Sequence, residues 1–130
     1  MDTTDIARVP PLVVARVGLG TMVLLAGIHK LAAPELWAVY VTDWLAPLLV
    51  VSPVVFMLVN GVLEIGFGLA IAADRLTIFT AGVAAVSLSA TVAYLALVAL
   101  LEGGLFLDIL IRDVGLAALA WAVVVDALGR

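Results

Sequence analysis

Four long apolar stretches dominate the pattern of the chain, and short polar segments separate them. The stretches cover about residues 12–33, 53–73, 76–101 and 105–128. Each holds about the 20 residues that an α-helix needs to cross a hydrocarbon core of ~30 Å, at a rise of ~1.5 Å per residue. The pattern therefore predicts an all-α integral membrane protein with four transmembrane helices.

The segments between these stretches are too short to hold a soluble domain. Asp74 and Arg75 form a very short turn, so we expect the second and third helices to be antiparallel neighbours. Glu102, Gly103 and Gly104 interrupt the third stretch in the same way. The pattern predicts one transmembrane domain over residues 1–130, an antiparallel up-and-down four-helix bundle.

The link between the first and second helices has a pattern of its own. Pro34 ends the first helix, because proline cannot continue it. Trp37, Tyr40 and Trp44 then follow at positions i, i+3 and i+7. This spacing places three aromatic rings on one helical face, and such rings prefer the membrane–water boundary. We expect a short helix that lies along the membrane surface.

Composition supports a membrane environment. Hydrophobic residues make up 66% of the chain and charged residues only 12%, with a mean hydropathy of +1.34. A soluble domain carries roughly 25% charged residues. A water-soluble surface cannot be built from so few charges, so the lipid bilayer is the expected surrounding.

Basic residues are divided unequally between the two ends of the predicted bundle. Four crossings place both termini on one side of the membrane. That side holds Arg8, Arg16, Arg75 and Arg130. The other side holds Lys30 and Arg112. Because basic loops stay preferentially in the cytoplasm, we expect a multi-pass protein of the cell membrane with both termini cytoplasmic.

Several kinds of chemistry are excluded or left without support. The chain has no cysteine and one histidine, His29, so it cannot supply thiolate ligands or two histidines to a haem. The net charge of −4 disfavours binding to nucleic acid, whose phosphates are bound by basic surfaces. No hydrolase, zinc or calcium signature occurs. We expect no metal site and no resident cofactor, and no catalytic residue is assigned.

Ionisable residues within the apolar stretches are the candidates for function. Each costs roughly 2.5–3.5 kcal/mol at the centre of a bilayer, so such residues usually face the interior of a bundle. Glu64 lies near the middle of the second stretch with Asn60 one turn away, and Arg112 and Asp113 lie in the outer part of the fourth. A buried carboxylate needs a partner. We expect an ion pair between Glu64 and Arg112.

Two further polar groups reach a similar depth. Tyr94 follows Ser87 and Thr91 on one face of the third stretch, and His29 closes the outer end of the first. The candidate ligand site therefore comprises Glu64, Arg112, Asn60, His29, Tyr94 and Asp113. Structural alternatives stay open. Polar pairs often only clamp membrane helices together, and His29 with Lys30 is also typical of a headgroup anchor.

Glycines in the first two stretches suggest close helix packing. They are Gly18, Gly20, Gly27, Gly61, Gly66 and Gly68. Small residues let the backbones of membrane helices approach each other. We expect the first and second helices to pack closely.

Short motifs in three of the helices resemble the DoxX family of small membrane proteins. They are Arg16-Val17-Gly18, Gly27-Ile28-His29-Lys30-Leu31 before Pro34, Glu64-Ile65-Gly66-Phe67-Gly68-Leu69, and Arg112-Asp113-Val114-Gly115-Leu116. The resemblance covers about residues 16–128. It implies a four-helix bundle and kinship with the DoxD-type subunit of thiosulfate:quinone oxidoreductases and with membrane partners of redox systems. It also matches Glu64 and Arg112 to polar positions of the family.

Three hypotheses for function follow. The first is a membrane subunit or partner of an oxidoreductase system, with a quinone head group held by the outer polar cluster and His29, Glu64 or Tyr94 as proton partners. An enzymatic role would exist only within such a complex. The second is a non-enzymatic assembly or interaction protein. The third is a small transporter, which would require a homo-oligomer because four helices leave little room for a pore, with a water path to Arg16 and Asp126.

Overall fold

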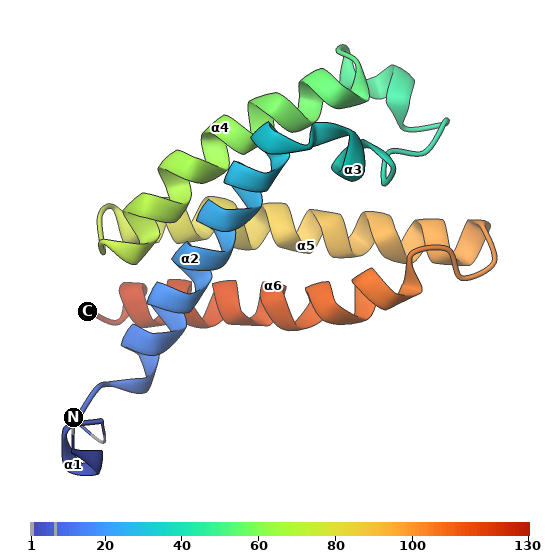
Figure 1. Ribbon diagram of the computed structural model, residues 1–130. Helices are drawn as coiled ribbons and strands as arrows, with labels where there is room; N and C mark the ends of the chain where they lie inside the picture. The colour runs from blue at the N-terminus through green and yellow to red at the C-terminus, as the bar shows by residue number, and fades with distance from the viewer. Residues whose placement is uncertain (1, 7) are drawn as a thin grey trace.

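A computed structural model describes residues 2–6 and 8–130 of the chain (Figure 1). These residues form helices and connecting turns, without a strand. The long helices are α2 (Pro11–Ala32), α4 (Pro53–Ala72), α5 (Thr77–Leu101) and α6 (Leu107–Leu128). Their ends lie within two residues of the stretches expected from the sequence. Short elements complete the order: α1 (Thr3–Ile6), α3 (Pro34–Ala38) and the 3₁₀ helix η1 (Ala46–Leu49).

Prolines define where several of the helices begin. Pro11, Pro34 and Pro53 occupy the first positions of α2, α3 and α4. Proline suits this place, because its fixed φ is helical and its missing N–H would have no partner there. The side chain of Ser52 also caps α4 by accepting a hydrogen bond of 3.2 Å from the Val55 amide.

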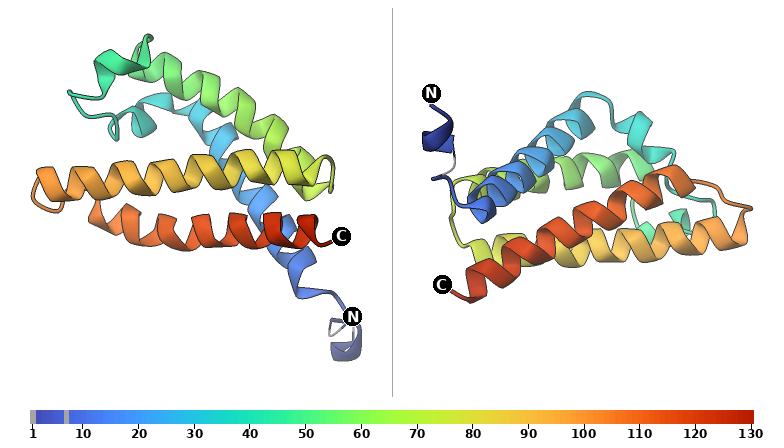
Figure 2. Two further views of the ribbon diagram at one scale, coloured as in Figure 1. Left: turned by 180° about the vertical axis from the view of Figure 1, so that it is seen from behind. Right: turned by 90° about the horizontal axis from the view of Figure 1, so that it is seen from below.

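The long helices are arranged as two pairs. Helix α2 packs along α4, and α5 packs along α6. The pairs meet at the end that carries the α4–α5 turn and both termini, and they diverge toward α3 and the α5–α6 loop (Figures 1 and 2). We call these the closed end and the open end. The wedge between the pairs positions the site described below.

Small apolar residues fill the closed end. Leu19, Ile71, Ala81 and Ala120 are fully buried there, and Val123 is buried almost completely. They come from all four long helices and pack in one cluster. The two alanines let the helix pairs approach each other, so this cluster fixes the apex of the wedge.

Glycine packs α2 tightly against α4, as the sequence predicted. A methyl group at Gly20 would lie 2.5 Å from the Ala72 amide nitrogen, and one at Gly27 would lie 2.7 Å from the Gly61 carbonyl oxygen. Gly68 is equally confined, so only hydrogen fits at these positions. The prediction is wrong for Gly18 and Gly66. They face outward, and nothing lies within 4 Å of an added methyl.

Three of the long helices are long and apolar enough to span a membrane. They are α2, α4 and α5. Helix α6 has 22 residues but carries Asp108, Arg112, Asp113 and Asp126.

The link after α2 differs from the sequence prediction. Helix α3 has five residues and ends at Ala38, so Trp37 lies within it whereas Tyr40 and Trp44 lie beyond. The expected face of three rings on one surface helix is therefore wrong. The chain continues as turns through Tyr40 and Val41, and the Thr42 amide then bonds the Tyr94 hydroxyl at 3.1 Å instead of continuing a helix.

Candidate functional site: a polar-lined cavity in the wedge

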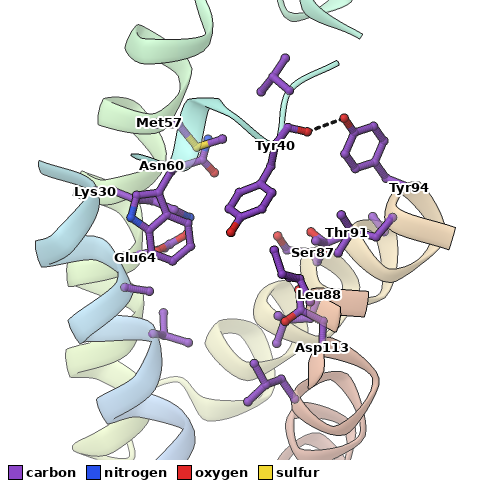
Figure 3. Close-up of a pocket in the computed structure, with 18 of the residues that line it drawn as sticks. Lys30, Tyr40, Met57, Asn60, Glu64, Ser87, Leu88, Thr91, Tyr94 and Asp113 are labelled. Atoms are coloured by element: carbon purple, nitrogen blue, oxygen red, sulfur yellow. Dashed lines mark hydrogen bonds and ion pairs between the residues drawn. The ribbon is translucent and has the colours of Figure 1, made fainter. Parts of the chain in front are cut away.

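A cavity of about 510 Å³ occupies the open end of the wedge, between the two helix pairs (Figure 3). Its walls are mainly apolar, with side chains such as Val23, Met57, Leu88 and Leu95. The polar residues on its walls include Lys30, Asn60, Glu64, Thr91, Tyr94 and Asp113. A mostly apolar cavity with a few polar groups is the usual form of a small-molecule site.

An ion pair between Lys30 and Glu64 forms the polar centre of one wall. The Lys30 ammonium contacts Glu64 Oε1, and the two side chains are 12% and 24% exposed. The expected pairing of Glu64 with Arg112 is therefore wrong. Lys30 lies on α2, which packs directly on α4, whereas Arg112 lies on α6 across the cavity. The nearer cation satisfies the carboxylate.

Glycine contacts explain why Lys30 reaches Glu64. The β-carbon of Glu64 lies 2.9 Å from where a methyl at Gly27 would be, and that of Lys30 lies 3.1 Å from the equivalent point at Gly61. Each charged residue thus stands over the glycine of the opposite helix. In both helices the charge follows its glycine by three residues, and this spacing was visible in the sequence.

The Trp37 ring covers the Lys30 ammonium, and His29 is bonded to Trp37. The Lys30 ammonium lies 4.7 Å from the centroid of the Trp37 ring, a cation–π contact. The Trp37 indole donates a hydrogen bond of 2.9 Å to His29 Nδ1. His29 itself is exposed and is not among the residues lining the cavity. Its position supports the anchoring interpretation better than the ligand one.

The open end is roofed by the segment between α3 and η1, and Tyr94 of α5 ties this roof down. The Tyr94 hydroxyl donates to the Tyr40 carbonyl at 2.6 Å and accepts from the Thr42 amide at 3.1 Å. The Trp44 ring packs on the Tyr94 ring with 5.6 Å between centroids. Tyr94 therefore lines the cavity while its hydroxyl is committed to the roof (Figure 3).

Arg112 and Asp113 contribute to the α6 wall. Arg112 Nε lies 3.3 Å from Asp113 Oδ1, and the Arg112 side chain is 64% exposed whereas that of Asp113 is 9% exposed. Asp113 and Arg112 both line the cavity. Asp113 thus lies on the cavity wall and Arg112 at its rim, whereas Asp108 is exposed and does not line the cavity.

The closed end holds a separate set of charges. Arg16 donates to the carbonyls of Ile71 and Ala72 at 3.1 and 2.8 Å, at the carboxyl end of α4. Its guanidinium lies 4.0 Å from Asp74, and Arg130 bonds the same carboxylate at 2.7 Å. A cation suits the negative end of a helix dipole. These contacts make Arg16 structural and leave no contact with Asp126.

Hydrogen bonds lower the pKa of Asp74, which lies in the turn between α4 and α5. The Arg130 guanidinium, followed by the Thr77 hydroxyl, holds the pKa of Asp74 well below its usual range. The same bond with Asp74 raises the pKa of Arg130. Both groups lie outside the long apolar helices. They form a clamp between the end of α6 and the α4–α5 turn.

The cavity brings together five of the six residues predicted from the sequence. Glu64, Asn60, Tyr94, Arg112 and Asp113 line it, and His29 does not. Sequence reasoning missed Lys30 as the partner of Glu64, and it missed Tyr40 and Met57 as lining residues. Lys30 was interpreted as a headgroup anchor because it stands near a helix end.

These features define an α-helical membrane protein whose helix pairs enclose a polar-lined cavity. The DoxX family model matches residues 12–96, which is well over half of the chain. The protein belongs to the DoxX family, as the motifs in α2 and α4 indicated. The motif at residues 112–116 lies beyond the matched stretch. Comparisons with curated proteins and with solved structures found no match.

Proposed function

We propose that this DoxX protein binds a quinone in its cavity and acts as a membrane subunit or partner of an oxidoreductase system. The observation that carries the proposal is the Lys30–Glu64 pair on the wall of an apolar cavity of about 510 Å³. A quinone matches this arrangement, because its ring carries polar oxygen atoms and its tail is apolar. The kinship of the family with quinone-linked oxidoreductases points the same way.

The proposal includes four membrane crossings. Helix α6 packs along α5 for most of its length and has 22 residues, enough for ~33 Å at ~1.5 Å per residue. Asp113, one of its charges, is buried at the cavity. With four crossings the clustered bases of the closed end, Arg16 and Arg130 among them, favour cytoplasmic termini.

Two of the predicted proton partners are less suited to that role than Glu64. The His29 ring is outside the cavity, and the Tyr94 hydroxyl is engaged by the roof. Glu64 lies on the cavity wall with one of its oxygens unpartnered. We therefore assign Glu64, with Lys30, as the polar contact for the quinone ring.

Binding of a short-chain quinone to purified protein tests the proposal. Decylubiquinone, supplied in its oxidised and its reduced form, should raise the Tm of the wild-type protein in detergent. A ligand present at ~100 times its Kd stabilises the native state by about 2.7 kcal/mol. Ala26→Phe would fill part of the cavity and should abolish the rise, because Ala26 lines it.

A matched control separates cavity filling from a general effect of a larger side chain. Ala122 is exposed on α6, so Ala122→Phe should keep the rise in Tm. Absence of stabilisation by either form in the wild-type protein would contradict quinone binding. It would favour the assembly protein, in which the Lys30–Glu64 pair only joins α2 to α4.

A transporter finds less support. The buried cluster around Leu19, Ile71 and Val123 fills the closed end, between the cavity and the Arg16 and Arg130 contacts. The residues lining the cavity do not include Arg16 or Asp126. A continuous water path would need these helices to separate, which the small-residue packing opposes.

A further inference from the structure

One carboxylate oxygen on the cavity wall lacks a hydrogen-bond partner. Within residues 2–6 and 8–130, Glu64 Oε2 is the one buried side-chain nitrogen or oxygen with no partner. A buried polar atom left without its bond costs roughly 1–3 kcal/mol. The cavity therefore has an unused acceptor that a bound molecule would satisfy.

The neighbouring donors make their hydrogen bonds to atoms other than Oε2. The Lys30 ammonium contacts the other oxygen of Glu64, Oε1. The Trp37 indole donates to His29, and the Asn60 amide nitrogen donates to the Phe56 carbonyl at 2.8 Å. None of these hydrogen bonds reaches Oε2, so this acceptor remains for a donor from a bound molecule.

The same wall presents acceptors to the cavity. A carboxylate paired with an ammonium group only accepts hydrogen bonds. One hydrogen of the Asn60 amide is committed to its own helix, and its carbonyl oxygen is a second acceptor on this side. Both side chains lie on the α4 side of the cavity, facing Tyr40 and Ser87 (Figure 3). A ligand oxygen that lies beside Glu64 Oε2 must therefore carry a hydrogen.

We propose that the cavity is selective for a head group with a hydroxyl donor, and so for the reduced, dihydroxy form of a quinone over the oxidised form. This inference rests on the proposed quinone binding. The oxidised ring offers only carbonyl oxygens, and one of them beside Oε2 would place two acceptors together. The hydroxyl of the reduced ring donates to Glu64 instead. Sites with a buried polar group reject analogues that leave it unpaired.

Affinities of the wild-type protein for the two redox forms test the selectivity directly. Isothermal titration without oxygen would compare decylubiquinol with decylubiquinone. We expect the quinol to bind at least about tenfold more tightly, which corresponds to ~1.4 kcal/mol. Equal affinities, or tighter binding of the quinone, would overturn the inference and leave the proposed function standing. No binding of either form would overturn the proposed function itself.

Variants at Glu64 identify the group responsible. Glu64→Gln puts an amide N–H₂ at the wall, so the preference for the quinol should fall toward one. Glu35→Gln is the matched control, since Glu35 is exposed on α3 and does not line the cavity, and it should keep the wild-type ratio.

A second variant removes the same acceptor without leaving a charge alone. Glu64→Gln strands the Lys30 ammonium, whereas Lys30→Met combined with Glu64→Leu removes the whole pair. This double variant should bind both redox forms equally. A preference that stays tenfold in the double variant would show that Glu64 is not the acceptor that selects the ligand.

Discussion

Lys30 combines helix packing with an ion pair on the cavity wall. Its stem packs beside Gly61, its ammonium contacts Glu64, and the Trp37 ring covers it. Two charges held in a mostly apolar setting depend on each other, since removing one leaves the other buried without compensation. Their contribution to stability is therefore tested by removing them singly and together.

Single replacements of the pair should destabilise the protein more than the double replacement does. Lys30→Met or Glu64→Leu should each lower the free energy of unfolding by about 3 kcal/mol, because a buried charge loses its partner. The double variant should recover most of that loss. Denaturation in mixed micelles, followed by circular dichroism, measures all three.

Arg112 provides the control for this cycle. Its side chain is 64% exposed and bonds Asp113, not Glu64. Arg112→Met leaves the buried Asp113 carboxylate without this partner, so it should itself destabilise the protein, but its effect should add to that of Glu64→Leu because Arg112 and Glu64 share no contact. A coupling between Arg112→Met and Glu64→Leu as large as that between Lys30→Met and Glu64→Leu would instead restore the pairing expected from the sequence.

Residue chemistry was easier to predict than residue partners. The sequence placed Glu64 near the midplane and Asn60 and Tyr94 in the outer half of the bundle, because depth follows directly from helix rise. It could not fix rotation about each helix axis, which decides whether Lys30 or Arg112 faces Glu64. Rotation is set by the contacts of Gly27 and Gly61, and these require both helices to be in place.

At the scale of elements, the α2–α4 pair depends on backbone contact. Gly20, Gly27, Gly61 and Gly68 leave no room for a side chain between the two helices. In a bilayer the hydrophobic effect does not drive helices together, so close van der Waals packing contributes much of the stability of the helix pair. Gly18 and Gly66 lie on the same two helices but face outward, so they take no part in this packing.

Gly68 and Gly66 both lie on α4, but only Gly68 is confined by α2. Substituting each with alanine therefore separates the effect of close packing from that of helix propensity. Gly68→Ala places a methyl 2.5 Å from the Leu24 amide nitrogen, so we expect a loss of about 1–3 kcal/mol through overpacking. Gly66→Ala meets nothing and should gain about 0.5–1 kcal/mol through higher helix propensity. Thermal melting in detergent compares them. Equal effects of the two substitutions would contradict the packing role.

Element boundaries followed from prolines and apolar length, whereas the link after α2 did not. The ring spacing of Trp37, Tyr40 and Trp44 suggested one helix, yet the chain turns after Ala38. The Tyr94 hydroxyl decides this by taking the Thr42 amide. A contact between residues 52 positions apart is invisible to local periodicity.

At the scale of the molecule, the membrane orientation is open to a direct test. The chain has no cysteine, so single-cysteine variants need no background removal. Thr3 lies near the N-terminus, and Glu102 lies in the α5–α6 loop at the opposite end. A membrane-impermeant maleimide should label Glu102→Cys in intact cells and Thr3→Cys only after lysis. The reverse pattern would place the termini outside.

Acid should weaken the clamp between the α4–α5 turn and Arg130. The pKa of Asp74 is lower in the folded than in the unfolded chain, where it is about 3.8. The carboxylate therefore stabilises the fold above that value, and the contribution is lost as the pH falls through the lower folded pKa. Stability of the wild-type protein should decline below pH ~3.8 more steeply than that of Asp74→Asn.

Glu102→Gln is the control for the acid experiment, since Glu102 is exposed at the opposite end of the molecule. It should follow the wild-type curve. Identical acid profiles for Asp74→Asn and the wild-type protein would show that the Arg130 contact adds nothing to stability.

The tether between Tyr94 and the roof links a buried event to the membrane surface. One hydroxyl on α5 holds the backbone at Tyr40 and Thr42, while the α3 end of the same segment is held to α2 through Trp37 and His29. A molecule that separated the two helix pairs would also pull on this segment, because the segment is attached to α2 at one end and to α5 at the other. If the proposed quinone binds, its entry is expected to move the backbone at Tyr40 and Thr42, so a protein partner that contacts this segment would detect the bound state without touching the ligand.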